Sequence, residues 1–216
     1  MREILCVGQL VCDLIVQNVD YRNLDVDTIR VDSISQKSGG DAMNTAISLS
    51  RLGSAVAFCG KVGADSFGDF LMASLKENGV DTSGVKTSGD VSTTIAIALV
   101  NKKGDRMFLY SGGASDTLAW QDVDPASICQ YRHVHVGGTY CLPLFDGDGA
   151  RRLFTESRRH GCTTSMDVTW DTSGKWLATI EPCLPYFDLF LPSEEECRCI
   201  TGLLCETPCS PFWTTA

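Results

Sequence analysis

A short stretch near the N-terminus, SGGDAMNTA at residues 38–46, contains residue types that hold polar ligands at the start of a helix. Gly39 and Gly40 precede Asp41, and Asn44 follows on the first or second turn of an expected helix. Bare backbone at a helix N-terminus lets a polar ligand approach closely, and an asparagine amide both donates and accepts hydrogen bonds. A plain turn with Asp41 as the helix N-cap explains the same residues. The stretch alone therefore leaves a ligand site and a structural turn open.

Other small or polar residues stand where buried strands are expected to end. They are Asp13, Gly137, Gly138, Asp167, Ser193 and Glu196. In an open parallel sheet, ligands bind beyond the C-terminal ends of the strands, so these positions predict a site along one edge. Ser193 and Glu196 also fit a helix capping box. Capping is the simpler explanation of Ser193, and both explanations stay open for Glu196.

The elements that must position these residues alternate along the chain. Apolar, β-rich runs predict strands at 3–8, 55–63, 133–138, 163–168 and 186–191. Amphipathic runs predict helices at 42–52, 66–78, 147–160 and 173–184. This alternation predicts a parallel sheet covered by helices on both faces. Two more exposed β regions, about 12–37 and 91–113, do not fit that sheet and predict a separate small sheet over one edge.

The composition fits one globular domain, with 216 residues of which 44% are hydrophobic. The formal net charge is −9 and no basic cluster exceeds two adjacent residues, so no nucleic-acid partner is expected. No apolar run approaches the roughly 18 residues that span a bilayer, which argues against a membrane partner. The N-terminal MREILCVGQL predicts a strand rather than a signal peptide. We therefore expect a cytoplasmic location.

Eleven cysteines and three histidines raise the question of a metal site. No C-x-x-C pattern occurs, and the cysteines at 197–209 are spaced C-x-C and C-x₃-C, unlike the usual zinc knuckles. His133 and His135 alternate with valines, which is typical of a strand with one more polar face. We therefore expect free thiols in a reducing compartment and no metal held by these residues.

On these motifs the sequence resembles the ribokinase-like carbohydrate kinases, also called the PfkB family. That family's first signature consists of paired small residues, an asparagine and two later glycines. GGDAMN at 39–44, Gly53 and Gly63 match it with every spacing met. VGQLVCDLIV resembles the family's opening strand, and LFLPSEEECRCITG resembles its N-x-x-E stretch with Ser193 in place of the asparagine. The resemblance covers nearly all of residues 1–204.

The resemblance implies a three-layer α/β sandwich with a mostly parallel central sheet. The segments 12–37 and 91–113 would form a β lid over the sugar. It implies ATP and Mg²⁺ as cofactors and transfer of the γ-phosphate to a hydroxyl of a small-molecule sugar. Apolar residues of these β regions, such as Ile95, Ile97, Phe108 and Tyr110, would leave the other face of the small sheet exposed, so we expect a homodimer through the lid. The substrate-binding residues would be Asp13, Gly39, Gly40, Asn44, Gly138 and Asp167. Ser193 and Glu196 would help to organise magnesium and phosphate.

The family's second signature is a Gly-Ala-Gly-Asp run that carries the catalytic base and a phosphate-binding helix N-terminus. No such run occurs in the 216 residues. By the resemblance, the C-terminal part of the fold is missing, residues 205–216 form an atypical tail, and no residue is assigned as the catalytic base. Three functions stay open: a carbohydrate kinase that is inactive as this truncated chain, a nucleoside kinase of the same fold, and a non-catalytic sugar-binding fragment.

Overall fold

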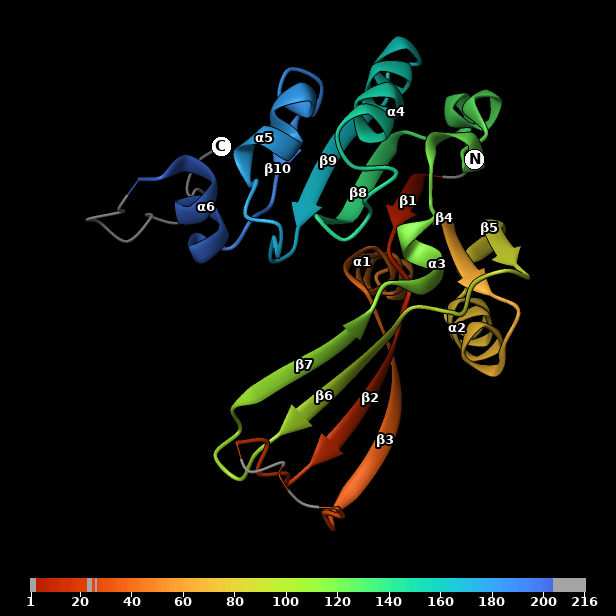
Figure 1. Cartoon of the computed structure of the whole chain (residues 1–216). Helices are drawn as coiled ribbons and strands as arrows, with labels where there is room; N and C mark the ends of the chain where they lie inside the picture. The colour runs from red at the N-terminus through yellow and green to blue at the C-terminus, as the bar shows by residue number, and fades with distance from the viewer. Residues whose placement is uncertain (1–2, 23–24, 26, 204–216) are drawn as a thin grey trace.

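The computed structural model describes residues 3–22, 25 and 27–203, so the expected tail at 205–216 lies outside the described residues. Its centre is a six-stranded sheet with the order β10-β9-β8-β1-β4-β5 (Figure 1). Every neighbouring pair in this sheet runs parallel, as the alternation of elements predicts. The strands are β1 (Ile4–Gly8), β4 (Val56–Gly63), β5 (Asp81–Ser88), β8 (His133–Thr139), β9 (Thr163–Val168) and β10 (Leu189–Phe190).

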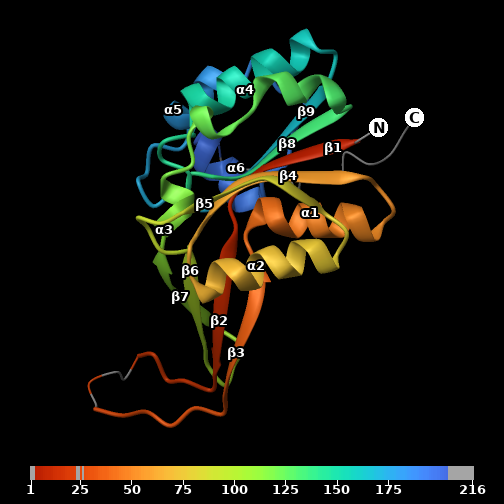
Figure 2. The same cartoon turned by 90° about the vertical axis from the view of Figure 1, so that its right-hand side faces the viewer.

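Helices cover both faces of this sheet and make three layers (Figure 2). One face carries α1 (Asp41–Arg51) and α2 (Ser66–Glu77), and the other carries α4 (Asp148–Arg159) and α5 (Leu177–Ile180). The shorter helical elements are α3 (Gly113–Asp116), α6 (Glu194–Thr201), η1 (Trp120–Asp122), η2 (Pro125–Gln130) and η3 (Glu181–Cys183). In the described part of the chain, no helix combines the length and the apolar character that crossing a membrane requires.

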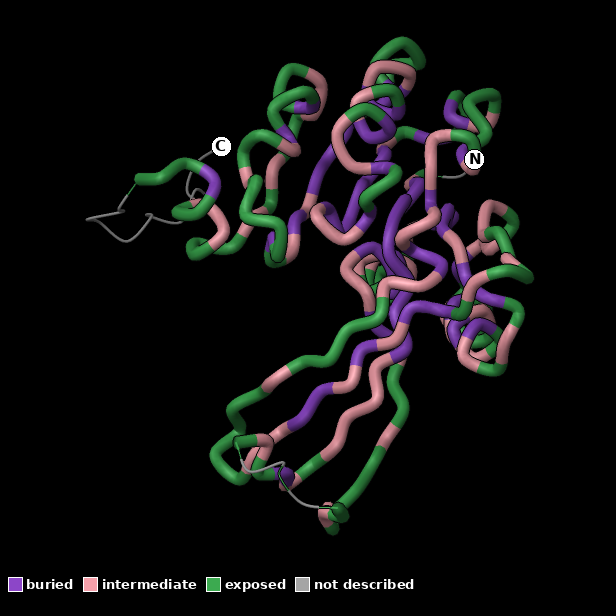
Figure 3. Tube along the Cα trace, viewed as in Figure 1, coloured by how far each residue is buried: buried purple, intermediate pink, exposed green. Residues whose placement is uncertain are grey.

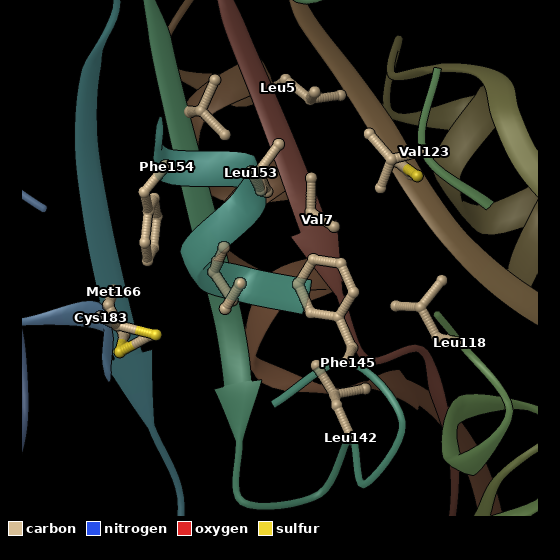
Figure 4. Close-up of a cluster of buried hydrophobic side chains, with 14 of the residues drawn as sticks. Leu5, Val7, Leu118, Val123, Leu142, Phe145, Leu153, Phe154, Met166 and Cys183 are labelled. Atoms are coloured by element: carbon tan, nitrogen blue, oxygen red, sulfur yellow. The ribbon is translucent and has the colours of Figure 1, made fainter. Parts of the chain in front are cut away.

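The core lies in two clusters, one on each face of the sheet. Leu5 and Val7 of β1 point into the cluster under α4, where Figure 4 shows them beside Leu153. Cys6 points the other way, into the cluster formed with α1 and α2. A central parallel strand is apolar on both faces for this reason, and Figure 3 shows the buried positions concentrated along the central strands.

A second, four-stranded sheet projects from one end of the molecule, as Figure 1 shows. We call it the small sheet. Its strand order is β3-β2-β6-β7, where β2 and β6 run parallel and the two outer pairs run antiparallel. Its strands are β2 (Val11–Gln17), β3 (Ser33–Gly39), β6 (Ile95–Val100) and β7 (Arg106–Ser111). The two exposed β regions of the sequence therefore form a separate sheet, as predicted.

Three predicted elements differ from the structure. The helix expected at 173–184 is reduced to α5 and η3, because the Asp171 carboxylate accepts hydrogen bonds from the backbone of Ser173 and Trp176 and holds a loop there. The strand expected at 186–191 shortens to β10. The strand β5 (Asp81–Ser88) was not predicted, because its residues DTSGVKTS contain no apolar run. Hydrogen bonding to β4 makes it a strand despite that composition.

Two predictions about single residues were also wrong. Asp13 does not end β1, because β1 stops at Gly8, where φ is +146°, and Asp13 lies inside β2. Asp41 is not the N-cap of α1. Gly40 occupies the cap position with φ of +94° and ψ of 133°, and Asp41 is the first helical residue. The Asp13 and Asp41 carboxyl groups therefore lie close to each other, where the small sheet meets α1.

Candidate functional site

The two glycines before α1 make room for groups of the chain itself. A Cβ on Gly39 would collide with the Asp13 carboxylate, and a Cβ on Gly40 would lie 2.6 Å from the Gln9 carbonyl oxygen. Gly40 also has a positive φ that side chains disfavour. The Asn44 backbone NH donates to the Gly40 carbonyl at 2.8 Å, while its side chain is exposed one turn after Asp41. In this structure the Asp13 carboxylate occupies the space that the missing Cβ of Gly39 leaves.

Four acidic residues from four elements gather beyond the start of α1. They are Asp13 of β2, Asp41 of α1, Asp167 of β9 and Glu196 of α6. Burial and the neighbouring Asp41 carboxylate raise the pKa of Asp13 to about 6, and the same two causes raise the pKa of Asp167 to about 6. Burial and the Glu196 carboxylate raise the pKa of Asp41 as well.

No cation contributes to the pKa of Asp13, Asp41 or Asp167 among the described residues. Carboxylates in such a setting favour ligands that donate hydrogen bonds. Of these acids, the sequence analysis did not assign Asp41, although its place two residues after Gly39 gave a signal for it.

Gln9 lies directly after β1 and is the central residue that the sequence analysis missed. Its side-chain Nε2 donates to the hydroxyl of Tyr110 on β7 at 2.6 Å. The Cys141 thiol interacts with both side chains, and burial raises its pKa to about 11. The sequence offers one signal for Gln9, which is a polar amide directly after an apolar, strand-like run in VGQL.

Two glycines at the end of β8 allow close packing against Gln9 and against α1. A Cβ on Gly138, where φ is +85°, would lie 2.8 Å from the Gln9 Cβ, and a Cβ on Gly137 would lie 2.7 Å from the Ala42 nitrogen. Gly138 therefore makes room for Gln9, and Gly137 lets α1 pack against β8.

His133 and His135 form hydrogen bonds to β9. His133 Nε2 lies 2.7 Å and His135 Nδ1 lies 2.9 Å from the Ser165 hydroxyl, which joins the two rings. Burial lowers the pKa of His135 to about 4, so its ring is neutral at ordinary pH. The expected strand with one polar face is confirmed by β8, and its histidines serve the contact between strands.

Ser193 and Glu196 form the capping box that the sequence suggests. The Ser193 backbone NH donates to Glu196 Oε2 at 2.7 Å, and the Glu196 NH donates to Ser193 Oγ at 3.3 Å. Glu196 nevertheless lies close enough to Asp41 and Asp167 to raise the pKa of both carboxyl groups. Within residues 3–22, 25 and 27–203, no three acidic, histidine or cysteine residues converge to hold a metal ion by themselves.

Comparison with known proteins places this arrangement in context. Residues 1–208 match the family described as "pfkB family carbohydrate kinase". A relative from Archaeoglobus fulgidus named "Uncharacterized sugar kinase" is 31% identical over 148 residues, which cover 68% of this chain and 58% of that protein. Ketohexokinase from Mus musculus is 32% identical over 139 residues, covering 63% of this chain and 46% of the enzyme. The chain thus spans about half the length of these curated relatives.

A solved structure shows the same fold. Ribokinase from Arabidopsis thaliana, solved as a complex with ribose and ATP, superimposes with a TM-score of 0.80 at 20% sequence identity. The match covers 96% of this chain and 65% of that chain. At this identity the likeness concerns the fold, and it includes both the parallel sheet and the small sheet.

Proposed function

The chain belongs to the pfkB family of carbohydrate kinases, and on that basis we propose that the junction of its two sheets binds the sugar that receives the γ-phosphate of ATP. The observation that carries this proposal is the set of carboxyl groups Asp13, Asp41 and Asp167, whose pKa values are raised with no cation among the causes. Sugar hydroxyls supply the donors that such carboxylates lack.

Asp13 and Asn44 are the residues we assign to the sugar hydroxyls. Each hydroxyl is both donor and acceptor, so an ionised carboxylate and an amide complement it from two sides. Gly39 leaves room for the Asp13 carboxylate, and Gly40 leaves room for the Gln9 backbone beside it. Gly138 contributes indirectly, because it makes room for Gln9. We assign the small sheet the role of a lid over this sugar.

Phosphate groups need positive charge to approach this edge, because the nearby acids repel them. Mg²⁺ commonly binds through one or two carboxylates together with substrate phosphates, and Glu196, with Ser193 beside it in the capping box, is the carboxylate we assign to it. This donor set fits a metal that arrives with ATP, since no three-acid cluster holds a metal alone in the described part of the chain. When bound, Mg²⁺ would neutralise charge on the phosphates.

The catalytic base is not assigned to any of these residues. The 216 residues contain no Gly-Ala-Gly-Asp run, and Asp167 is assigned to the sugar in this proposal. We therefore propose that this polypeptide binds sugar without measurable phosphate transfer. Transfer needs both a proton acceptor and donors for the spreading phosphate charge, and each contributes about 10²–10⁴-fold in rate.

A panel of thermal shift measurements tests the substrate class. We expect D-fructose or D-ribose to raise the melting temperature, with L-glucose as the matched control that leaves it unchanged. Stabilisation by adenosine alone would favour the nucleoside kinase alternative. Stabilisation by none of these compounds at millimolar concentration would refute a sugar site at this edge. A sugar-dependent release of ADP would refute the proposed lack of transfer and separate a kinase from a non-catalytic binding protein.

A further inference from the structure

One side-chain pair joins the outer strand of the small sheet to the end of the parallel sheet. Gln9, with 5% of its surface exposed, donates from Nε2 to the hydroxyl of Tyr110 at 2.6 Å. The Tyr110 side chain lies on β7, the outer strand of the small sheet, and is 45% exposed. The bond therefore connects an anchored amide with a residue carried by a projecting strand.

The Gln9 side of this pair is fixed by its surroundings. Its backbone NH donates to the Gly137 carbonyl at 3.3 Å. A Cβ on Gly40 would press on its carbonyl oxygen, and a Cβ on Gly138 would press on its side chain. Gln9 is thus enclosed by the backbone before α1 and by the end of β8. Movement at this contact must come from Tyr110 and the small sheet.

Tyr110 and Asp13 lie in the same cross-strand row of the small sheet, with Ala96 between them. Asp13 pairs with Ala96, and Ala96 pairs with Tyr110, in the register of β2, β6 and β7. Residues directly opposite each other on neighbouring strands point to the same face. Fixing Tyr110 therefore also fixes the face of the small sheet that carries the Asp13 carboxylate.

We propose that Gln9 and Tyr110 form a latch that holds the small sheet closed over the start of α1 and so positions Asp13 for the sugar. Both partners belong to the chain, so the bond forms without a ligand. Burial and the Cys141 thiol beside them raise the pKa of Tyr110, so its hydroxyl is protonated at physiological pH. Gln9 and Tyr110 are positioning residues here, and this role rests on the proposed sugar site.

Hydrogen exchange of the β7 amides (Arg106–Ser111) tests the latch without any sugar. We expect Tyr110→Phe to speed this exchange about three- to tenfold, the range that one lost hydrogen bond supports. Tyr186→Phe is the matched control, because it removes a phenol hydroxyl near Arg151, away from the small sheet. The double variant Gln9→Met with Tyr110→Phe should exchange no faster than the faster single variant, because both break the same bond. Exchange in Tyr110→Phe at the wild-type rate would overturn the latch.

Calorimetric titration with D-fructose and with D-ribose tests the positioning role. When fewer molecules are closed, the apparent affinity falls in proportion, so Tyr110→Phe should weaken binding about three- to tenfold and Tyr186→Phe should not. Unchanged or tighter binding in Tyr110→Phe would overturn the positioning role. If neither sugar binds the wild type, the proposed function and the positioning role that rests on it both fail. The exchange experiment still decides whether the latch exists.

Discussion

Replacing Asp13 by asparagine should make the protein more stable at neutral pH while weakening sugar binding. The wild-type carboxylate lies against Asp41, and among the described residues no donor or cation offsets its burial. Asparagine has nearly the same shape and no charge, so it removes this repulsion. When replacing a residue stabilises the fold and weakens ligand binding, the residue has a role in binding and not in folding.

The size of the effect follows from the pKa of Asp13, which is raised from 3.8 to about 6. A shift of about two units corresponds to about 3 kcal/mol, and partial solvent exposure reduces this to about 1–2 kcal/mol. Because the folded pKa is the higher one, stability linked to the bound proton is complete below about pH 4 and lost as pH rises through about 6. Asp13→Asn should therefore gain about 1–2 kcal/mol at pH 7.5 and almost nothing at pH 4.

Thermal unfolding from pH 4 to 8 measures this difference directly. For a chain of this size we expect Asp13→Asn to melt about 2–8 °C higher than the wild type at pH 7.5. The exposed Asp90→Asn is the matched control, and it should leave the difference near zero at every pH. An Asp13→Asn variant that melts below the wild type at pH 7.5 would show that the carboxylate is stabilised by its surroundings, and would refute this reasoning.

Four further predictions concern the site and its surroundings. Gly39→Ala should weaken D-fructose or D-ribose binding about tenfold or more in calorimetry, because its Cβ displaces the Asp13 carboxylate; Gly89→Ala, whose Cβ meets nothing within 4 Å, should bind like the wild type. Ser193→Ala should cost about 1 kcal/mol in urea unfolding through loss of the α6 cap and leave sugar affinity unchanged. The 216-residue polypeptide should release no sugar-dependent ADP in a coupled assay, and turnover of about one per second would contradict that. The exposed Ile34 and Leu109, on the face of the small sheet opposite Asp13, predict a dimer, which light scattering at tens of micromolar would contradict by giving a monomer mass.

The parallel sheet and the small sheet could be predicted from sequence because their patterns are local. Along β8, the valines point into the cluster under α4. The alternating histidines point to the other face, where they form hydrogen bonds to Ser165 of the neighbouring strand β9. β5 could not be predicted, because its strand character depends on pairing with β4 rather than on its own residues. The same is true of the loop before α5, which a single carboxylate, Asp171, holds open.

The candidate site was predictable in its glycines and less so in its geometry. The spacing of Gly39, Gly40 and Asn44 marked the start of α1 correctly. Asp13 was assigned to the wrong strand, because one apolar run continues through the break after Gly8. Gln9 was missed because its importance comes from contacts with residues up to 129 positions away, including Gly138 and Tyr110. Such contacts exist only after the two sheets meet.

Calorimetric titration of the wild type, Asp13→Asn and Asn44→Ala with D-fructose and D-ribose at pH 7.5 tests the sugar site most directly. Asn44 is exposed, so its replacement should leave the melting temperature nearly unchanged. The account predicts that the wild type binds at least one of these sugars. Asp13→Asn should lose about 10- to 100-fold in affinity, because a hydrogen bond to a charged group contributes about 1.5–3 kcal/mol. Asn44→Ala should lose about 2- to 10-fold, because a neutral hydrogen bond contributes about 0.5–1.5 kcal/mol. Equal affinity in all three proteins would contradict the assignment of the sugar to the junction of the two sheets.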